Sequence, residues 1–432
     1  MDMQKNNNNK QHLLQALRAL SHQHVEATEQ QLFEDFIAHA VQDHLDIDYL
    51  NRPLEMIFWN LNGLYRCMRA PSEDCFVDGN YIGQIEIYNP SQDTHGWESD
   101  HTLIYINGPD RPFLVDSLRI SLNARGPTIY NLRSTPLWIG RDDDGMATSI
   151  AAKETSGTRL EAIITVEIEP RETEEIAPIR QQLVDVLHDI DLVVGDFSRM
   201  RSELVKVIDE LERLMPECHE RDESLAFLRW MYDGAFVFLG CIAFTLEQRE
   251  GQQTLCEVET SRLGLFFGDR DQPLSRPLDQ LSSGVKALYS DDRVLSFATS
   301  SHRSHIHRSG YAHYVVVKRL DESGHAIGEL RFMGLHSSRF YSSNSARIPI
   351  LRSRVEWLLE NAGFAVDSHD HKSLRTIADG YPRDELLQMP ADELLKTLIG
   401  IWQIYERNAI RVFAHRDQFE KFVSCLVFIP RE

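Results

Sequence analysis

The chain has 432 residues, too many for one ordinary hydrophobic core, so we expect roughly two to four domains. Hydrophobic residues make up 42% and charged residues 26%, a balance typical of folded globular protein that excludes wholesale disorder. Acidic residues outnumber basic ones by 66 to 45, and the net charge of −21 repels nucleic-acid phosphates and anionic lipid headgroups. We therefore expect no nucleic acid and no membrane as partners.

The cysteines and the hydropathy of the chain indicate its compartment. The six cysteines are scattered without a CxxC pair, which argues against a zinc ribbon and a disulfide scaffold and fits a reducing cytoplasm. No apolar run approaches the roughly 18 residues that a membrane span needs, and no apolar segment follows the polar, Asn-rich start. We expect a cytoplasmic protein whose first ten residues are disordered.

Residues 1–83 are predicted to form a helical preface. Apolar residues recur at helical spacing, first at Leu13 and Leu17, and then at Phe33, Phe36 and Ile37. This spacing predicts two helices before residue 46. The following residues are mixed in character and lead into a strand-like segment that ends near residue 88.

Residues 84–198 show the clearest pattern in the chain. A strand at 102–106 is followed by the turn 107–110, and Asp110 at its end is suited to cap a helix. Leu114, Leu118 and Leu122 then fall on one helical stripe, which the Gly-Pro pair at 126–127 ends. This part of the sequence predicts a strand, a loop and a helix.

The second half of this segment predicts a hairpin, a helix and a last strand. The β-branched and apolar segments 128–139 and 160–168 are expected to pair as a long antiparallel hairpin. An acidic first turn at 172–175 introduces a helix, and the apolar segment 192–197 is expected to form one more strand. The resulting order is βαββαβ, the plan of ferredoxin-like folds.

The remainder predicts further modules, so the fold class is α+β and multidomain. We expect a connector helix at 199–223, a second antiparallel α/β domain at 224–345 and a helical module at 346–410. Strands of the second domain are expected at 236–240, 294–298, 311–319 and 329–335. Residues 411–432 read as a hairpin, which alone is marginal in water, so we interpret them as the opening of a truncated third domain.

No catalytic or cofactor-binding residue is predicted. The sequence has no GxGxxG fingerprint, no GxxxxGK[ST] phosphate loop, and no HExxH or GxSxG motif. In the run of His302, His305 and His307, the last two share one face of an extended strand and could hold zinc or copper, but no cysteine or carboxylate triplet accompanies the run. We therefore favour a polar surface, predict no metal ligand, and leave the role of this histidine run open.

Other chemically suggestive residues have a simpler structural interpretation. Cys241 and Cys256 lie in apolar strands and are expected to be buried, inert thiols. Trp230, Phe236 and Phe238 could line an aromatic ligand box, yet strand alternation already accounts for them as core residues. In the segment 368–371, Ser368 or Asp370 is expected to cap a helix rather than to join a metal site.

One candidate ligand site remains, at the turn before the helix that starts near residue 113. A helix amino terminus presents unpaired N–H groups and a partial positive charge, which suit the carboxylate of a small ligand. The candidate binding residues are Asn107, Gly108, Asp110, Arg111 and Pro112. The alternative is that Asp110 merely caps the helix.

The turn sequence GPDRPFLVDS at 108–117 resembles the strand–helix loop of ACT domains, small βαββαβ modules that often bind amino acids at subunit interfaces. Further motifs resemble the amino-terminal region of the large bacterial NAD-specific glutamate dehydrogenases, in that family's order. They are IYNP at 87–90, GWES at 96–99, LRWMYDG at 228–234, FLG at 238–240, VKRL at 317–320, FMGL at 332–335, IPIL at 348–351, YPRDE at 381–385 and FVSCLVFIPR at 422–431.

This resemblance implies an ACT-like module at 84–198, a PAS- or ACT-like module at 224–345, and the start of a third ACT-like domain at 411–432. It implies that the complete protein oxidises L-glutamate with NAD and water to 2-oxoglutarate, ammonia and NADH, as part of amino acid catabolism. The catalytic domain would lie outside this chain, so NAD is implied for the parent protein and no cofactor for the chain itself. Expected partners are the rest of the dehydrogenase chain, other copies in a homo-oligomer, and a small amino-acid effector.

The sequence departs from the family pattern at two places and leaves two other hypotheses open. Phe113 stands where amino-acid-binding ACT domains usually have a small glycine, so its bulk could fill the ligand space and leave an assembly module. The histidine run at 302–307 is not a pattern of the family. The alternatives are a stand-alone amino-acid-sensing ACT-type protein without catalysis, and a metal-dependent enzyme at 302–307.

Overall fold

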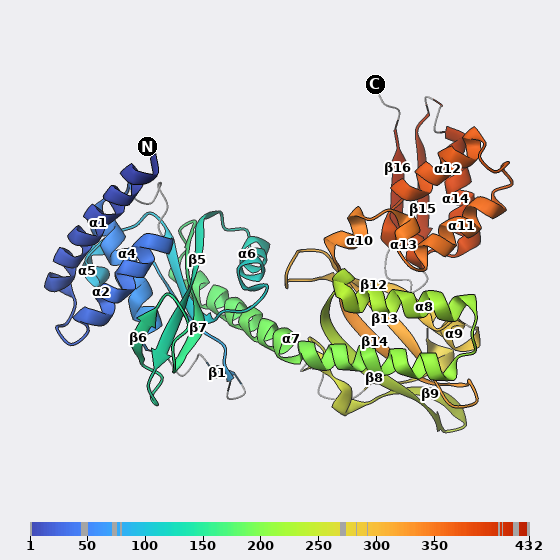
Figure 1. Ribbon diagram of the computed structural model, residues 1–432, viewed down its shortest axis with the longest axis horizontal. Coiled ribbons are helices and arrows are strands. Elements are labelled where there is room, and N and C mark those ends of the chain that lie inside the picture. The colour runs from blue at the N-terminus through green and yellow to red at the C-terminus, as the bar shows by residue number, and fades with distance from the viewer. Residues whose placement is uncertain are drawn as a thin grey trace. The chain divides into compact units, whose positions relative to one another are not determined.

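The computed structural model describes residues 2–44, 51–70, 76–77, 80–267, 274–281, 283–291, 293–404, 407, 409–417 and 423–429. The chain divides into two compact units (Figure 1). Unit 1 comprises Met1–Asp191 together with His305–Arg308, and unit 2 comprises Leu192–Ser304 and Ser309–Glu432. Within the described residues, no helix is long and apolar enough to cross a membrane.

Unit 1 begins with helices, as the apolar spacing predicts. They are α1 (Asp2–His24), α2 (Gln30–His39), a π-helical turn (Ala40–His44) and α4 (Leu54–Arg69). Phe33, Phe36, Phe58 and Tyr65 are fully buried between them, with ring centroids 5.0–6.4 Å apart. Whereas we expected the first ten residues to be disordered, α1 is helical from Asp2.

A five-stranded antiparallel sheet forms the body of unit 1, in the order β3-β4-β7-β5-β6. The strands are β3 (Gln84–Tyr88), β4 (Thr102–Pro109), β5 (Ile129–Arg141), β6 (Ala147–Ala151) and β7 (Thr158–Ile168). Between them lie α5 (Gln92–His95) and α6 (Leu114–Ala124), and a small ladder pairs β1 (Phe76–Val77) with β2 (Asn80–Tyr81). Successive residues of β4 face opposite sides of the sheet, and Leu103 to Ile106 are all buried, so both faces are covered.

The strand expected at 192–197 does not form, and that prediction is wrong. These residues continue α7 (Thr173–Leu214), a single helix of 42 residues. Ile190, Val193, Met200 and Leu204 are buried at spacings of three, seven and four residues, so helical periodicity outweighs the local β propensity. The βαββαβ order therefore lacks its last strand, and β3 pairs with β4 at that edge instead.

Unit 2 is built on a seven-stranded antiparallel sheet, in the order β11-β9-β8-β14-β13-β12 with β10 also paired to β8. The strands are β8 (Phe236–Arg249), β9 (Gln252–Glu257), β10 (Leu263–Gly264), β11 (Ser275–Pro277), β12 (Leu295–Arg303), β13 (Tyr311–Leu320) and β14 (Ala326–His336). Each strand expected from sequence in this domain coincides with one of them. The connector expected at 199–223 is divided between the end of α7 and α8 (His219–Trp230), which a π-helical turn (Met231–Ala235) joins to β8.

Helices predicted after residue 346 share one core with this sheet. They are α11 (Leu351–Asn361), α12 (His369–Gly380), α13 (Arg383–Gln388) and α14 (Ala391–Ile404). Short elements accompany the sheet and these helices: α9 (Ser283–Ser290), α10 (Ser338–Ser342), and the 3₁₀ turns Glu259–Ser261, Leu278–Gln280 and Ser345–Arg347. The Ser368 hydroxyl accepts the His371 N–H at 3.1 Å, so its predicted capping role is confirmed.

The hairpin predicted at the end is present, with β15 (Arg411–Arg416) paired to β16 (Val423–Phe428). Phe413, Leu426 and Phe428 pack against the core of unit 2, whereas Val412 and Val427 are exposed. The aromatic and cysteine predictions for this unit are also confirmed. Trp230, Phe236 and Phe238 belong to the core, and Cys241 and Cys256 are buried.

Candidate functional site

The predicted ligand turn in unit 1 leads from β4 into α6. Asn107 is fully buried in β4, where its Nδ2 donates to Glu161 Oε2 at 2.8 Å and its carbonyl accepts the Tyr81 hydroxyl at 3.1 Å. Glu161 in turn accepts two hydrogen bonds of 2.7 Å from Arg141, whose side chain is almost fully buried. Asn107 is therefore held by a buried, charge-assisted network inside the sheet.

Gly108 and Phe113 both occupy positions where the backbone geometry is unusual. A Cβ on Gly108 would lie 2.9 Å from Gly83 Cα, so this position needs glycine for close packing of two backbone segments. Phe113 is the N-cap of α6 and has φ +72°, which is uncommon for a residue with a side chain. The N-cap position is therefore occupied by Phe113 and not by Asp110, so the alternative interpretation of Asp110 as the cap is wrong.

The charged residues of the turn differ in their surroundings. Arg111 forms an ion pair with Asp191 of α7. Asp110 is exposed as a whole residue, but its carboxyl is partly desolvated by neighbouring groups, and this raises the pKa of the carboxyl. The Asn107 amide N–H and Arg111 thus already contact internal partners, whereas the Asn107 Oδ1 is buried without a hydrogen-bond partner among the described residues. Asp110 and Pro112 stay at the surface.

The histidine run does not converge on a metal-like geometry. His305 Nε2 lies 2.6 Å from Asp189 Oδ2, and the His307 backbone N–H donates to the Ser117 hydroxyl at 3.1 Å, both within unit 1. The His307 ring lies 5.0 Å from the Phe113 ring, and burial lowers the pKa of the His307 imidazole. The two imidazoles therefore have different partners, as separate loop residues do.

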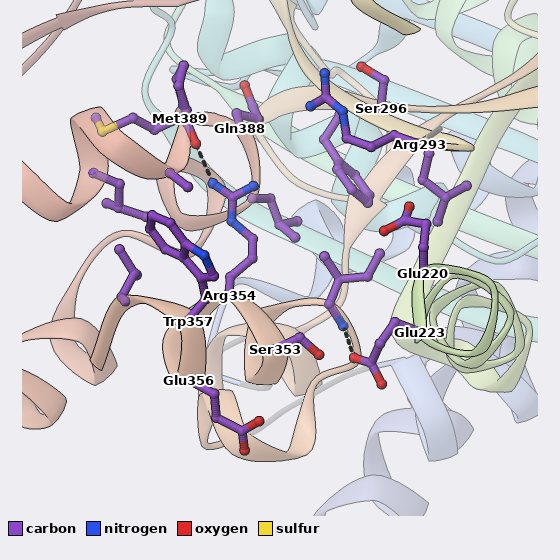
Figure 2. Close-up of a pocket in the computed structure, with 18 of the residues that line it drawn as sticks. Glu220, Glu223, Arg293, Ser296, Ser353, Arg354, Glu356, Trp357, Gln388 and Met389 are labelled. Carbon is purple, nitrogen blue, oxygen red and sulfur yellow. Dashed lines mark hydrogen bonds between the residues drawn. The ribbon is translucent and has the colours of Figure 1, made fainter. Parts of the chain in front are cut away.

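Unit 2 contains a large pocket that the sequence did not predict (Figure 2). Its volume is about 910 Å³, and α8, α11, α13 and the start of β12 provide most of its lining. Charged and polar lining residues include Glu220, Glu223, Arg293, Ser296, Ser353, Arg354, Glu356 and Gln388, beside apolar residues such as Trp357 and Phe297. A pocket of this size, lined by both apolar and charged side chains, has the general character of a small-molecule site.

Arg354 is the distinctive residue of this pocket. Its guanidinium donates to the Met389 carbonyl, and its Nε has no hydrogen-bond partner in the described part of the chain (Figure 2). Burial, with a contribution from the positive charge of Arg293, lowers the pKa of Arg354 to about 10. Among the described residues no carboxylate forms an ion pair with Arg354, although glutamates also line the pocket.

The backbone beside Arg354 is strained. Ile350 has φ +67° and ψ −50°, and the Leu351 N–H donates to the Pro349 carbonyl at 2.8 Å, which defines a γ-turn of positive φ. The Glu223 carboxylate stabilises this turn because it accepts a 2.8 Å hydrogen bond from the Ile350 N–H and further hydrogen bonds from the Arg352 guanidinium. Such conformations persist only where the surroundings hold them, and they gather at binding sites.

Comparison with known proteins places three segments of the chain in one family. Residues 36–183 match the family model for the glutamate dehydrogenase ACT1 domain, residues 348–407 match that for glutamate dehydrogenase helical motif 1, and residues 411–432 match that for the ACT2 domain. The chain belongs to the NAD-specific glutamate dehydrogenase family. The resemblance stated from sequence motifs is confirmed.

Curated relatives carry the same assignment. The chain is 36% identical over 360 residues to the NAD-specific glutamate dehydrogenase of Halomonas elongata, and 33% identical over 354 residues to that of Pseudomonas aeruginosa. Each match covers 81% of this chain and 22% of the relative. The enzyme of Mycobacterium tuberculosis is 26% identical over 326 residues. The chain thus spans about a fifth of the length of the glutamate dehydrogenases that it matches.

The family assignment also locates the two regions described above. The turn from Asn107 to Phe113 lies in the ACT1 domain. Ile350, Arg354 and Gln388 lie in helical motif 1, so this glutamate dehydrogenase segment provides one wall of the pocket and unit 2 residues before it provide the other. Sequence reasoning missed the pocket because its residues are spread from 219 to 394 and share no motif.

Proposed function

We propose that this chain is the regulatory and oligomer-forming region of an NAD-specific glutamate dehydrogenase. The complete enzyme would convert L-glutamate, NAD and water to 2-oxoglutarate, ammonia and NADH, in the cytoplasm and in amino acid catabolism. The ordered matches to ACT1, helical motif 1 and ACT2 carry this proposal. Its partners would be the rest of the dehydrogenase chain and other copies of it. NAD would bind outside this chain.

The same proposal includes domains or segments at 1–83, 84–198, 199–223, 224–345, 346–410 and 411–432. We assign a ferredoxin-like ancestry to the ACT1 sheet, because β3 occupies the edge that the fourth strand takes in that plan. A PAS- or ACT-like origin for the sheet of unit 2 is supported only by its antiparallel order and by its place between ACT1 and helical motif 1.

We further propose that an amino acid acts as the effector. Two sites are candidates: the ACT1 turn, with Asn107, Gly108, Asp110, Arg111 and Pro112, and the pocket around Arg354. The charges favour the pocket, because Arg111 already forms an ion pair with Asp191 whereas Arg354 forms no ion pair with a carboxylate among the described residues. Arg354 would bind the ligand carboxylate, and Glu220 or Glu356 in the same lining would attract its ammonium group.

Calorimetry on the 432-residue protein distinguishes the two sites. Amino acids are titrated into the wild type and into Arg354→Gln and Arg111→Ala, with Arg375→Gln as a control, since Arg375 is an exposed arginine on α12 outside the pocket. We expect Arg354→Gln to weaken binding by at least about tenfold, because a charge-assisted hydrogen bond contributes about 1.5–3 kcal/mol. The other two variants should bind as the wild type does.

Loss of binding in Arg111→Ala alone would move the effector to the ACT1 turn. If no amino acid binds at millimolar concentration, the effector proposal fails and only the assembly role remains. Initial rates of the full-length dehydrogenase, with and without the bound amino acid, then test regulation, because an effector must distinguish two states of the enzyme to change its rate.

A further inference from the structure

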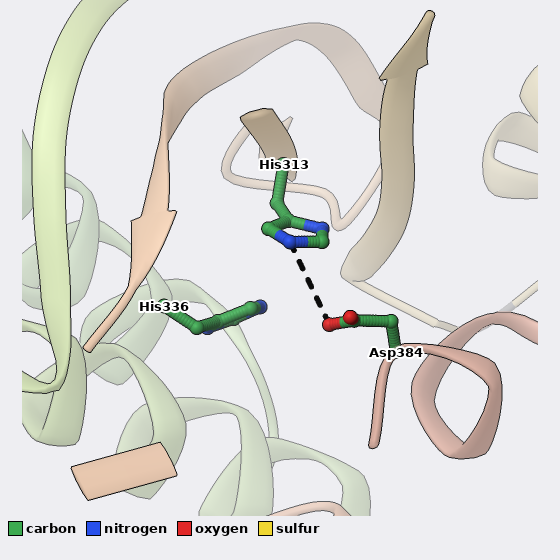
Figure 3. Close-up of side chains that lie close together, drawn as sticks. All are labelled: His313, His336 and Asp384. Carbon is green, nitrogen blue, oxygen red and sulfur yellow. Dashed lines mark ion pairs between the residues drawn. The ribbon is translucent and has the colours of Figure 1, made fainter. Parts of the chain in front are cut away.

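Two buried histidines and a carboxylate converge in unit 2 at a place that the sequence did not suggest. His313 lies on β13, His336 is the last residue of β14, and Asp384 lies in the first turn of α13 (Figure 3). One side-chain nitrogen of each histidine and one carboxylate oxygen all lie within 4.8 Å of one another. Only 5% of His313 and 2% of His336 is exposed, so solvent contributes little to this cluster from the sheet side.

The imidazole of His313 is oriented by a second layer of contacts. Its Nδ1 lies 3.3 Å from the Thr299 hydroxyl of β12, which also accepts Gln388 Nε2 of α13 at 2.8 Å. Its Nε2 faces Asp384 Oδ1 at 3.7 Å, too long for a direct hydrogen bond. Outer-shell contacts of this kind fix the tautomer and the ring direction of histidines that bind metal ions.

The other two residues are also held in place. The His336 ring is stacked on Phe340 at 4.0 Å with an interplanar angle of 15°, and the Phe236 ring meets it edge-on at 5.4 Å. The Tyr341 hydroxyl donates to Asp384 Oδ2 at 3.3 Å. Packing and hydrogen bonding therefore restrict each of the three side chains to a conformation that faces the same point.

We propose that His313, His336 and Asp384 bind a divalent transition-metal ion, with Zn²⁺ as the best-suited ion. Two neutral imidazoles and one carboxylate are a donor set that such ions take in proteins, with water in the remaining position. Imidazole nitrogens about 2.0–2.1 Å from zinc stand roughly 3.3 Å apart in a tetrahedron, so the three groups move together by about 1 Å on binding. The ion also neutralises the carboxylate charge that faces the two imidazoles.

The site would connect the sheet of unit 2 to helical motif 1. His313 and His336 belong to the sheet, whereas Asp384 belongs to the segment 348–407. An ion held by all three would stabilise α13 against the sheet, because binding to the folded state alone adds to its stability. The proposal does not depend on the effector role argued above, since no ligand of the metal lines the Arg354 pocket.

The test uses the untagged 432-residue protein after treatment with a chelator. We expect calorimetry with Zn²⁺ to show one ion per chain, and saturating Zn²⁺ to raise the Tm by several degrees. Co²⁺ in place of Zn²⁺ should give the visible absorption of a nitrogen- and oxygen-ligated ion. Absence of stoichiometric binding, with an unchanged Tm, would show that the cluster is an ordinary buried hydrogen-bonded group and would overturn the proposal.

Variants locate the ion. Asp384→Asn preserves side-chain volume at a partly exposed position, so the variant should fold. Its affinity for Zn²⁺ should fall by more than the roughly 10- to 100-fold that the loss of an outer-shell partner costs. Thr299→Val should cost only that smaller factor. His325→Gln serves as the control, because His325 lies exposed on the turn between β13 and β14. Retained affinity in Asp384→Asn combined with loss in His305→Gln would place the ion at the other histidine run and refute this site.

Discussion

At the scale of single residues, the contact between Glu223 and the strained turn at Ile350 shows how one carboxylate supports a pocket. Ile350 is β-branched and has φ +67°, a conformation that costs of order 1–3 kcal/mol. Glu223 accepts hydrogen bonds from the Ile350 N–H and from Arg352, and its side chain is 9% exposed. Removing the carboxylate charge therefore weakens both contacts at once.

The stability that Glu223 provides should depend on pH. Burial raises its pKa, but the hydrogen bonds from Arg352 and from the Ile350 N–H outweigh burial, so its pKa in the folded protein is lowered. A lowered pKa means that the stabilisation is complete above the pKa of the unfolded chain, about 4.3, and is lost as the pH falls through the folded value. We expect Glu223→Gln to lower the free energy of unfolding by about 1 kcal/mol at pH 7, since Arg352 is partly exposed.

Urea denaturation of the wild type and Glu223→Gln at pH 7 and at pH 3 measures this difference. It should be present at pH 7 and shrink at pH 3. Glu360→Gln, an exposed carboxylate in the same pocket lining, is the matched control and should differ little from the wild type at either pH. A difference of equal size at both pH values would contradict the role of the charge.

At the scale of elements, α7 shows where local pattern and tertiary structure disagree. The segment 192–197 is rich in residues of high β propensity, and a strand there would complete the βαββαβ order that the sequence suggests. In the structure the segment lies inside a 42-residue helix that contributes residues to both units. Gly195 is also exposed in the middle of this helix, although glycine disfavours helices.

Gly195→Ala should therefore stabilise the protein. A Cβ at Gly195 would have no heavy atom within 4 Å, so alanine removes the helix penalty of glycine, about 0.5–1 kcal/mol, without a clash. Gly234→Ala is the control of opposite sign, because its Cβ is equally free of contacts but its φ is +89°. Thermal unfolding should show a higher Tm for the first variant and a lower Tm for the second. A lower Tm for Gly195→Ala would argue that the segment is not helical in solution.

At the scale of the whole molecule, the sequence and the family matches together lead to an expectation about activity. The chain has no glycine fingerprint for a dinucleotide and spans about a fifth of the length of its glutamate dehydrogenase relatives. We expect the purified 432-residue protein to form no NADH from L-glutamate and NAD, and to bind no NAD by calorimetry. The full-length enzyme is the positive control. Glutamate-dependent NADH formation by the isolated chain would contradict the proposal that catalysis takes place outside this chain.

The sequence by itself determined the family, most of the elements and their order. Strand alternation, helical stripes and the breaks at Gly363, Pro382 and Pro390 are local signals, and the strands they predict between residues 236 and 335 and the helices they predict after residue 346 are present. The family motifs are also contiguous, so they could be recognised without coordinates. These features depend on residues that are neighbours in the chain.

Only the tertiary structure decided which distant residues meet. His313, His336 and Asp384 come from two strands and a helix, and the pocket around Arg354 combines residues from 219 to 394. The ends of α7 and the edge position of β3 were settled in the same way, because burial against the rest of each unit outweighs local propensity. Chemical sites depend on such convergence in space, and spacing along the chain does not encode it.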